Sequence, residues 1–116
     1  MSPSLLDFLK HIEHECSFIL RVSKGKNRDE ILNDELLCKG LVRSIEIIGE
    51  AIKKIDGDFK LEHPNVEWKK IAGTRDIMIH HYFGIDYDIV LDIIENKIPE
   101  LQHCIKKIIE IEETGK

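Results

Sequence analysis

The stretch LCKGLVRSIEIIGEAIKKI, residues 37–55, decides the fold. Its larger apolar side chains recur in alternating steps of three and four residues, which is the spacing of one continuous helix face. They are Cys38, Leu41, Ile45, Ile48, Ile52 and Ile55. A second line of smaller residues, Leu37, Ser44 and Ala51, follows the same helix, and Ile47 lies off both lines. A helix that is apolar on more than one side is buried by more than one neighbour, so we expect this helix to be central.

The chain before this stretch predicts another helix. Residues 5–19 carry apolar side chains in the same alternating steps, after Ser2 and Pro3 as the expected N-cap and first helical residue. Either Asn27 or Asn33 is expected to cap the helix that follows.

The second half of the chain predicts two more helices. One spans about residues 66–83, after Asn65 as its N-cap, and stops at Gly84, a residue typical of the position after a helix. The other runs over about residues 85–112 and contains Pro99, which lacks a backbone donor and should kink or divide it.

These four blocks, with essentially no strand alternation, predict an all-α fold. We expect an up-and-down antiparallel helical bundle of four to five helices, the last kinked or split at Pro99, in a single domain over residues 1–116. The second apolar line on residues 37–55 suggests that two such bundles pair as a two-fold symmetric dimer.

The composition is that of an ordinary soluble globular protein, with 42% hydrophobic and 34% charged residues. No apolar run approaches the roughly 18 residues of a membrane span, and the charged N-terminus lacks a signal-peptide core, so we expect a cytoplasmic protein without a membrane partner. Cys16, Cys38 and Cys104 are widely spaced and are interpreted as small buried thiols, not as a disulfide framework. The net charge of −5 excludes binding of nucleic acid by bulk electrostatics, but not a local basic site near Lys69 and Arg75.

The stretch RDIMIHHYFGID, residues 75–86, mixes reactive side chains with apolar ones. On a helical wheel at about 100° per residue, Arg75 lies in the middle of the apolar stripe. An unpaired buried arginine costs several kcal/mol, so Arg75 either meets a carboxylate or faces a cleft. Glu46 or Glu50 could neutralise it in a structural salt bridge. Alternatively, its planar set of donors binds an anion.

His80 is the candidate for proton exchange in this stretch, because a histidine titrates near neutral pH. It lies about 140° from Arg75 on an ideal helix, on the side of Lys69, so the two residues do not share a face of one helix. This objection weakens if the helix unwinds near Gly84, or if a symmetric partner brings its own copies to the same cleft. A structural histidine is the alternative. No ligand set stands at metal-site spacing, and we expect neither a metal nor another cofactor.

The residues of this stretch resemble the signature Arg-x4-His-x-Tyr of the HEPN (higher eukaryotes and prokaryotes nucleotide-binding) superfamily. The closest resemblance is to the HepT toxins of toxin–antitoxin pairs of the HepT/MntA (minimal nucleotidyltransferase) type. Three further segments are similar to that family, and together the four cover nearly the whole chain. They are RSIEIIGEAIKKI (43–55), WKKIAGTRD (68–76) and YFGIDYDIVLDIIENKIPEL (82–101).

The resemblance implies a helical bundle that forms a homodimer, with the motif helices of both subunits lining one cleft. It implies a metal-independent endoribonuclease that acts on an RNA substrate. Arg75 then matches the arginine that holds the scissile phosphate, and His80 matches the histidine that moves protons at the reacting oxygens. Tyr82 matches the tyrosine that a cognate nucleotidyltransferase antitoxin modifies with AMP, which silences the toxin.

The chain departs from the family pattern at one position and is ambiguous at another. Many relatives have Asn after the arginine, whereas this chain has Asp76, whose negative charge near a phosphate would lower activity. His81 also fits a looser Arg-x4-6-His spacing, but only His80 keeps His-x-Tyr. The main alternative function is a non-catalytic dimeric module that binds a nucleotide or substrate for a nucleotidyltransferase partner. A third is a plain dimeric scaffold in which Arg75 is locked in an internal salt bridge.

Overall fold

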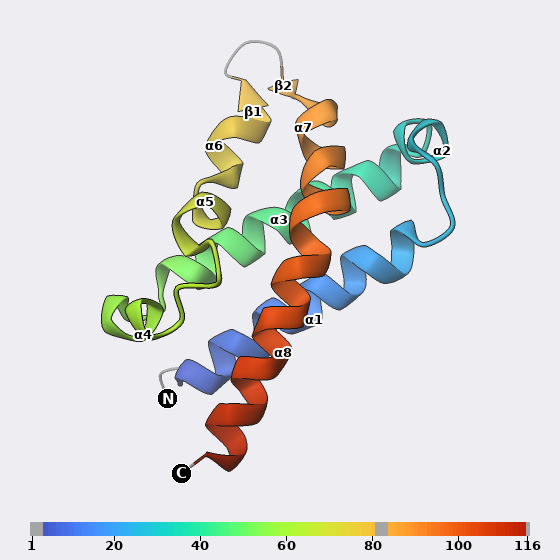
Figure 1. Cartoon of the computed structure of the whole chain (residues 1–116). Coiled ribbons are helices and arrows are strands. Elements are labelled where there is room, and N and C mark those ends of the chain that lie inside the picture. Colours follow the sequence, from blue (N-terminus) through green and yellow to red (C-terminus); the bar gives the residue numbers. More distant parts are fainter. Residues whose placement is uncertain (1–3, 81–83, 116) are drawn as a thin grey trace.

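The computed structural model describes residues 4–80 and 84–115, apart from the side chain of His80. Two long antiparallel helices, α1 (Leu5–Ser23) and α3 (Glu35–Lys53), pack side by side, and α8 (Ile98–Thr114) crosses α1 (Figure 1). The short helix α2 (Arg28–Leu32) connects α1 to α3.

The second half of the chain leaves one end of α3, runs away from it and then turns back to cross the α1–α3 pair (Figure 1). Its elements up to α8 are α4 (Gly57–Glu62), α5 (Trp68–Ala72), α6 (Thr74–Met78), the two-residue strands β1 (Ile79–His80) and β2 (Gly84–Ile85), α7 (Tyr87–Asp92) and the π-helical turn η1 (Ile93–Lys97). Both α5 and α6 pack on α3, and α6 also contacts α7. The predicted all-α class is confirmed, with one minimal antiparallel strand pair added to it.

The apolar face predicted for α3 is confirmed as the centre of the core. Each of its six larger residues is at most 5% exposed: Cys38, Leu41, Ile45, Ile48, Ile52 and Ile55. The facing side chains of α1 and α8 are also buried; they are Leu9, Ile12, Cys16, Ile19, Leu101, Ile105 and Ile108. Isolated helices would be marginal in water, so the packing of α1 against α3 and of α8 against α1 holds the fold together.

The second line on α3 is covered within the same chain. Ser44 and Ala51 are buried, and the Ser44 hydroxyl donates a hydrogen bond of 2.7 Å to Oε1 of Glu15 on α1. Helix α3 therefore packs against α1 on one side and the α5–α6 segment on another, within one chain. The line explains the central place of α3 and gives no separate support to pairing of two bundles, so the homodimer stays a prediction.

The N-terminal helix begins at a different cap from the one expected. Ser4 caps α1: its hydroxyl accepts from the Asp7 N–H at 3.2 Å, and the Asp7 carboxylate accepts from the Ser4 N–H at 2.9 Å. This reciprocal pair satisfies two backbone donors and so favours a helix that begins after Ser4. Ser2 and Pro3 lie outside the described residues. Asn27, one of the two predicted caps, caps α2.

The single helix predicted over residues 66–83 is wrong in its extent. The helical segment is interrupted at Gly73 and ends at Met78, after which Ile79 is extended (φ −104°, ψ 121°). Isoleucine favours strands, and Ile79 pairs across to β2. Gly84 adopts φ +77°, a left-handed conformation that costs glycine little. Gly84 thus belongs to a hairpin and not to a helix end.

Asn65 also differs from its predicted role. Helix α5 begins only at Trp68, whose indole N–H donates to the His63 carbonyl at 3.0 Å. The Asn65 amide lies 3.7 Å from the Cys104 sulfur, to which it donates. The side chain predicted as an N-cap therefore ties the α4–α5 connection to α8.

The last helix departs from regular α-helical geometry just before Pro99, through a π-helical turn and not through a break in the helix. The turn η1 precedes Pro99, and the Ile98 N–H that closes this turn donates to the carbonyl of Ile93, five residues earlier. A proline lacks its own N–H and crowds the carbonyl of the residue four positions before it. The wider π-turn shifts the hydrogen-bond ladder just before this ring, and α8 then begins with Pro99 in its first turn.

The three cysteines are free thiols, as predicted. Cys16 and Cys38 are buried and Cys104 is half-buried. Burial, with the negative charges of Glu13 and Glu15 nearby, raises the pKa of Cys16 to about 12. None of the helices within residues 4–80 and 84–115 combines the length and apolar character needed to span a bilayer.

Candidate active site

Arg75 lies in the first turn of α6 and forms an ion pair with α3. Its Nε donates to Oε2 of Glu46 at 3.1 Å. The Glu46 partner that the structural interpretation named is therefore confirmed. The pair does not lie inside the protein, because 57% of the Arg75 side chain is exposed while Glu46 is only 18% exposed, and the alternative of a cleft at an interface stays a prediction. The helical wheel that placed Arg75 in the apolar stripe assumed one unbroken helix through Gly73, but the helix is interrupted at that residue.

A second arginine joins this pair from α3 itself. Nη1 of Arg43 lies 3.8 Å from Oε1 of Glu46 and 3.5 Å from Oε1 of Glu50. Glu50 thus pairs with Arg43 and not with Arg75. Arg43 was not predicted from the sequence, although its place three residues before Glu46 on a predicted helix was a usable signal. The result is a cluster of two half-exposed guanidinium groups held around one carboxylate, named here the arginine cluster (Arg43, Glu46, Glu50 and Arg75).

Close backbone contact fixes the position of this cluster. A Cβ on Gly49 would stand 3.3 Å from the carbonyl oxygen of Ala72, so α3 and α5 approach as near as a glycine allows. Thr74 is buried and its hydroxyl donates to the Ile71 carbonyl at 2.7 Å, which satisfies one acceptor at the break between α5 and α6. Gly49 and Thr74 therefore help to fix the position of α6 relative to α3, and with it the position of Arg75 beside Glu46.

His80 follows Arg75 by less than two helical turns of sequence but does not lie on α6. The helix has ended at Met78, and His80 is part of β1. The wheel angle between the two residues therefore does not apply, and the unwinding considered from the sequence occurs, earlier than Gly84. The Asp86 N–H donates to the Met78 carbonyl at 2.8 Å and fastens the base of the hairpin. The His80 side chain, His81 and Tyr82 lie outside what the structure describes.

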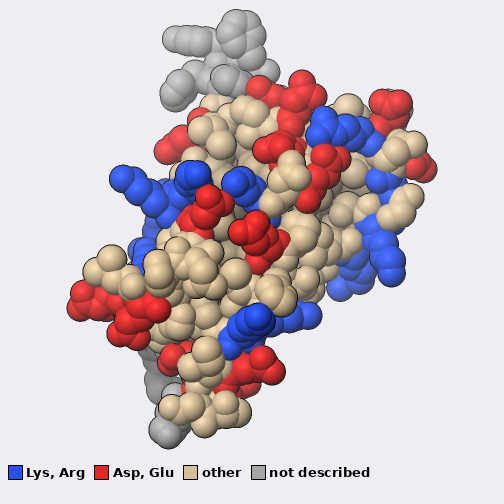
Figure 2. All heavy atoms as spheres, in the orientation of Figure 1, with Lys and Arg blue, Asp and Glu red and all other residues tan. Residues whose placement is uncertain are grey.

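The remaining candidate residues occupy different surroundings. Asp76 is exposed on α6 directly after Arg75. Lys69 is exposed on α5 and lines a hollow with Lys70, to which Arg75 does not contribute. On the face seen in Figure 2, Lys and Arg side chains form separate groups with Asp and Glu between them, and no continuous basic surface. Contact with an anion would therefore rest on local groups such as the arginine cluster.

No metal centre is assembled from the part of the chain that the structure describes. Within residues 4–80 and 84–115, no three His, Cys, Asp or Glu side chains are arranged to hold an ion. The arginine cluster offers guanidinium donors, which bind the oxygens of phosphate and carboxylate groups.

Comparison with known proteins decides the family. The model of the family described as Ribonuclease HepT-like matches residues 12–108, which enclose the arginine cluster and the hairpin. The chain belongs to the HepT-like ribonuclease family. A protein of Caldanaerobacter subterraneus subsp. tengcongensis named "Putative RNase TTE0752" is 43% identical over 105 residues, which cover 90% of this chain and 94% of that protein.

Two archaeal relatives extend this HepT-like group. "Putative RNase MJ0127" of Methanocaldococcus jannaschii is 42% identical over 105 residues, which cover 87% of each chain. "Probable ribonuclease HepT" of Thermococcus cleftensis is 33% identical over 108 residues, which cover 93% of this chain and 98% of that protein. No solved structure matches. The family inferred from the four sequence segments is thus confirmed.

Proposed function

We propose that this HepT-like protein is a metal-independent endoribonuclease and the toxin of a toxin–antitoxin pair. The observation that carries the proposal is the exposed Arg75, held at one nitrogen by Glu46 and placed on the short helix α6 that leads to His80. An arginine has five N–H donors, and the pair with Glu46 uses the one on Nε. The guanidinium is thus oriented and still accessible to a phosphate.

The proposed chemistry uses side chains alone. Arg75 binds the scissile phosphate and stabilises the charge that it gains as the 2′-oxygen attacks phosphorus. His80 takes the proton of the 2′-hydroxyl or gives one to the departing 5′-oxygen. One P–O bond forms and one breaks, which leaves a 2′,3′-cyclic phosphate and a 5′-hydroxyl. Neither a metal ion nor a water molecule enters this step.

A homodimer would complete the site. The arginine cluster of one chain has two positive and two negative formal charges, so it offers a phosphate no net attraction. A two-fold axis beside α6 would bring a second Arg75 and a second His80 to the same cleft. Sedimentation equilibrium of the unmodified protein tests this part of the proposal, and a monomer at all concentrations would contradict it.

Regulation would act through Tyr82. A cognate nucleotidyltransferase antitoxin would attach AMP to its phenolic oxygen, two residues from His80. The adduct carries negative charge and bulk into a cleft built for phosphate, so it would exclude RNA both electrostatically and sterically.

A second candidate function rests on Asp76. Its exposed carboxylate follows Arg75 directly and adds negative charge beside the phosphate site. The protein would then be a non-catalytic dimeric module that recognises a nucleotide or substrate for its nucleotidyltransferase partner. Binding without cutting distinguishes this function from the first.

The deciding experiment is RNA cleavage by the unmodified protein in EDTA, beside His80→Ala at equal concentration. Intact mass must first show Tyr82 free of AMP, because a modified sample would be inert for another reason. We expect the wild type to cut and the variant to bind RNA without cutting. Circular dichroism of both proteins provides the folding control.

Each other outcome has a definite meaning. If both folded proteins are inert but bind RNA, the nuclease proposal fails and the binding module replaces it. If His80→Ala cuts at the wild-type rate, His80 has no part in the chemistry and His81 becomes the candidate. If cutting stops in EDTA and returns with a divalent cation, metal independence is wrong.

A further inference from the structure

A hollow of about 340 Å³ lies on the second half of the chain, between the α5–α6 segment and the α7–η1 segment. Its floor is apolar and is formed by Ile71, Ile77, Ile89 and Ile93. Arg75 does not line it, so this is a different place from the arginine cluster. Its volume lies within the roughly 300–1,000 Å³ typical of small-ligand sites.

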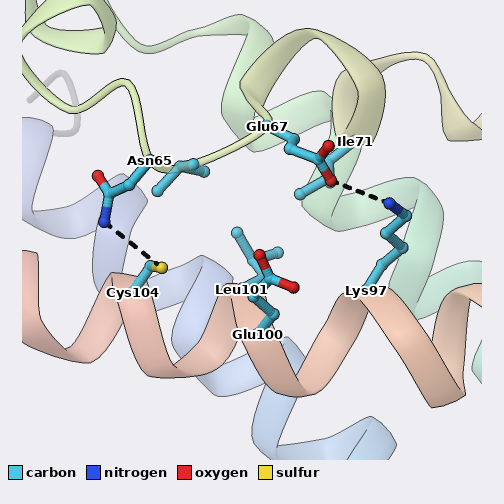
Figure 3. A pocket seen from close by; sticks show the side chains of 8 residues that line it. Asn65, Glu67, Ile71, Lys97, Glu100, Leu101 and Cys104 are labelled. Carbon is cyan, nitrogen blue, oxygen red and sulfur yellow. Dashed lines mark hydrogen bonds and ion pairs between the residues drawn. The ribbon is translucent and has the colours of Figure 1, made fainter.

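The rim of this hollow is basic. Lys69, Lys70 and Lys97 line it, against a single carboxylate, Asp92. Glu67 stands outside the rim and holds two of these lysines, Lys97 at 3.0 Å and Lys70 at 3.2 Å. Figure 3 shows the Lys97 ammonium group directed at Glu67 across the gap between η1 and the start of α5.

The third rim lysine, Lys69, differs from the other two. Within residues 4–80 and 84–115, Lys69 has no ion-pair partner, and it is exposed. With Glu67 counted, three lysines face two carboxylates around the hollow, so it keeps a net positive charge in a chain of net charge −5. Its charge complements an anion whose other part is apolar.

Two features of the backbone and surface point to the same hollow. Ile93 and Lys97, the first and last residues of the π-helical turn η1, both line it. Single π-turns occur frequently at functional sites, and this one also accommodates Pro99. Ile77, which lines the hollow from α6, leaves 53% of its surface exposed. The fold therefore keeps a large apolar side chain open to solvent between lysines.

We propose that this hollow binds one unstacked base of a single-stranded RNA, with the rim lysines on the phosphates at either side. The inference rests on the proposed function, because it gives the same RNA a second contact away from Arg75. Every base has an apolar face that packs on such a floor, and flanking lysines follow the backbone without reading sequence. Duplex RNA keeps its bases stacked and cannot fill the hollow. The site would therefore select unpaired segments for cleavage.

The first test compares two isoleucines of equal exposure. Ile77→Glu places a carboxylate in the hollow, and Ile111→Glu makes the same change on α8, where Ile111 is 54% exposed. Both changes are made in the His80→Ala background, and binding of a fluorescein-labelled single-stranded RNA is followed by anisotropy. We expect Ile77→Glu to weaken binding about tenfold, because the carboxylate removes apolar contact with the base and repels the phosphates, and Ile111→Glu to have little effect.

The second test compares two lysines. Lys69→Gln removes the uncommitted rim charge, and Lys106→Gln removes an exposed lysine from a separate hollow between α1 and α8. Loss of one phosphate contact should reduce the slope of log affinity against log salt by about 0.7 for Lys69→Gln alone. This conservative variant also keeps the proposal testable if Ile77→Glu fails to fold.

The possible results separate this inference from the nuclease proposal. Unchanged binding of Ile77→Glu and Lys69→Gln, or equal losses for single-stranded and duplex RNA, would overturn the hollow as a base site. Absence of any RNA binding would overturn it as well, and would favour a protein partner for this surface. If Ile77→Glu loses binding while the wild type fails to cut RNA, the hollow stands and only the nuclease proposal fails.

Discussion

Replacing Arg75 by alanine should remove RNA cleavage at little cost in stability. The ion pair with Glu46 is a single contact of 3.1 Å, and 57% of the arginine side chain is exposed to solvent. Exposed pairs of this kind contribute about 0.2–1 kcal/mol, because water screens them and two long side chains lose freedom. The free energy of unfolding should therefore fall by less than about 1 kcal/mol. For a domain of this size that lowers Tm by no more than roughly 3–6 °C.

The effect on cleavage should be much larger. Removing one donor that stabilises a developing negative charge typically costs a factor of about 10²–10³ in rate, which corresponds to roughly 3–4 kcal/mol of barrier. We place Arg75 on the scissile phosphate, so its replacement should lower the cleavage rate by a factor in this range. The two effects thus differ by several-fold in free energy, and one variant measured in two assays distinguishes them.

The assays are urea unfolding followed by circular dichroism, and cleavage of a labelled RNA in EDTA. Arg75→Lys is the matched control: it keeps the charge and can still reach Glu46, but it loses the planar set of donors. We expect wild-type stability and reduced cleavage from it. A loss above about 3 kcal/mol in Arg75→Ala would show a structural ion pair instead. Wild-type cleavage by a folded Arg75→Ala would refute the catalytic assignment.

Three further predictions follow from the fold. Ile48→Ala, at a fully buried position of α3, should lower the free energy of unfolding by about 2–5 kcal/mol in urea titrations, since it leaves a cavity in the core. In alkylation with iodoacetamide at pH 8 followed by peptide mass, the half-buried Cys104 should react first, and Cys16, with its pKa of about 12, only after unfolding. The side-chain hydrogen bond from Lys97 lowers the pKa of Glu67 from its usual 4.5, so the stability that wild type has over Glu67→Gln should be complete at neutral pH and vanish as pH falls through that lowered pKa.

The helical core could be predicted from sequence because its signal is local and repeated. Five apolar residues on α3, and Ile55 just after it, agree on one buried face, and a single misread residue would not change the outcome. The departure from α-helical geometry just before Pro99 was predictable for a different reason, since the missing N–H acts wherever that residue stands. Both features follow from the chain without knowledge of its neighbours.

The pairing of residues 79–80 with residues 84–85 could not be predicted in this way. Helical spacing and strand propensity conflict there: Ile79 continues an apolar helical pattern, yet isoleucine also favours strands. The conflict is decided by tertiary contacts, the pairing of Ile79 with β2 and the bond from the Asp86 N–H to the Met78 carbonyl. The same assumption of one unbroken helix put Arg75 in the middle of an apolar stripe and gave its angle to His80 as that of an ideal helix. The ion-pair partner of Arg75 was easier to predict, because the sequence interpretation named only two carboxylates, Glu46 and Glu50.

The charge of the arginine cluster bears on where RNA affinity would come from. Two arginines and two glutamates cancel, so the cluster can orient a phosphate but cannot attract one over a distance. A polyanion would meet a chain of net charge −5, and its attraction must come from groups outside the cluster. The lysine-rimmed hollow is one such source in the described chain, and a second subunit would double it. A neutral cleavage site with a separate basic contact would bind only those RNAs that reach both, which is a physical basis for selecting unpaired RNA without reading its sequence.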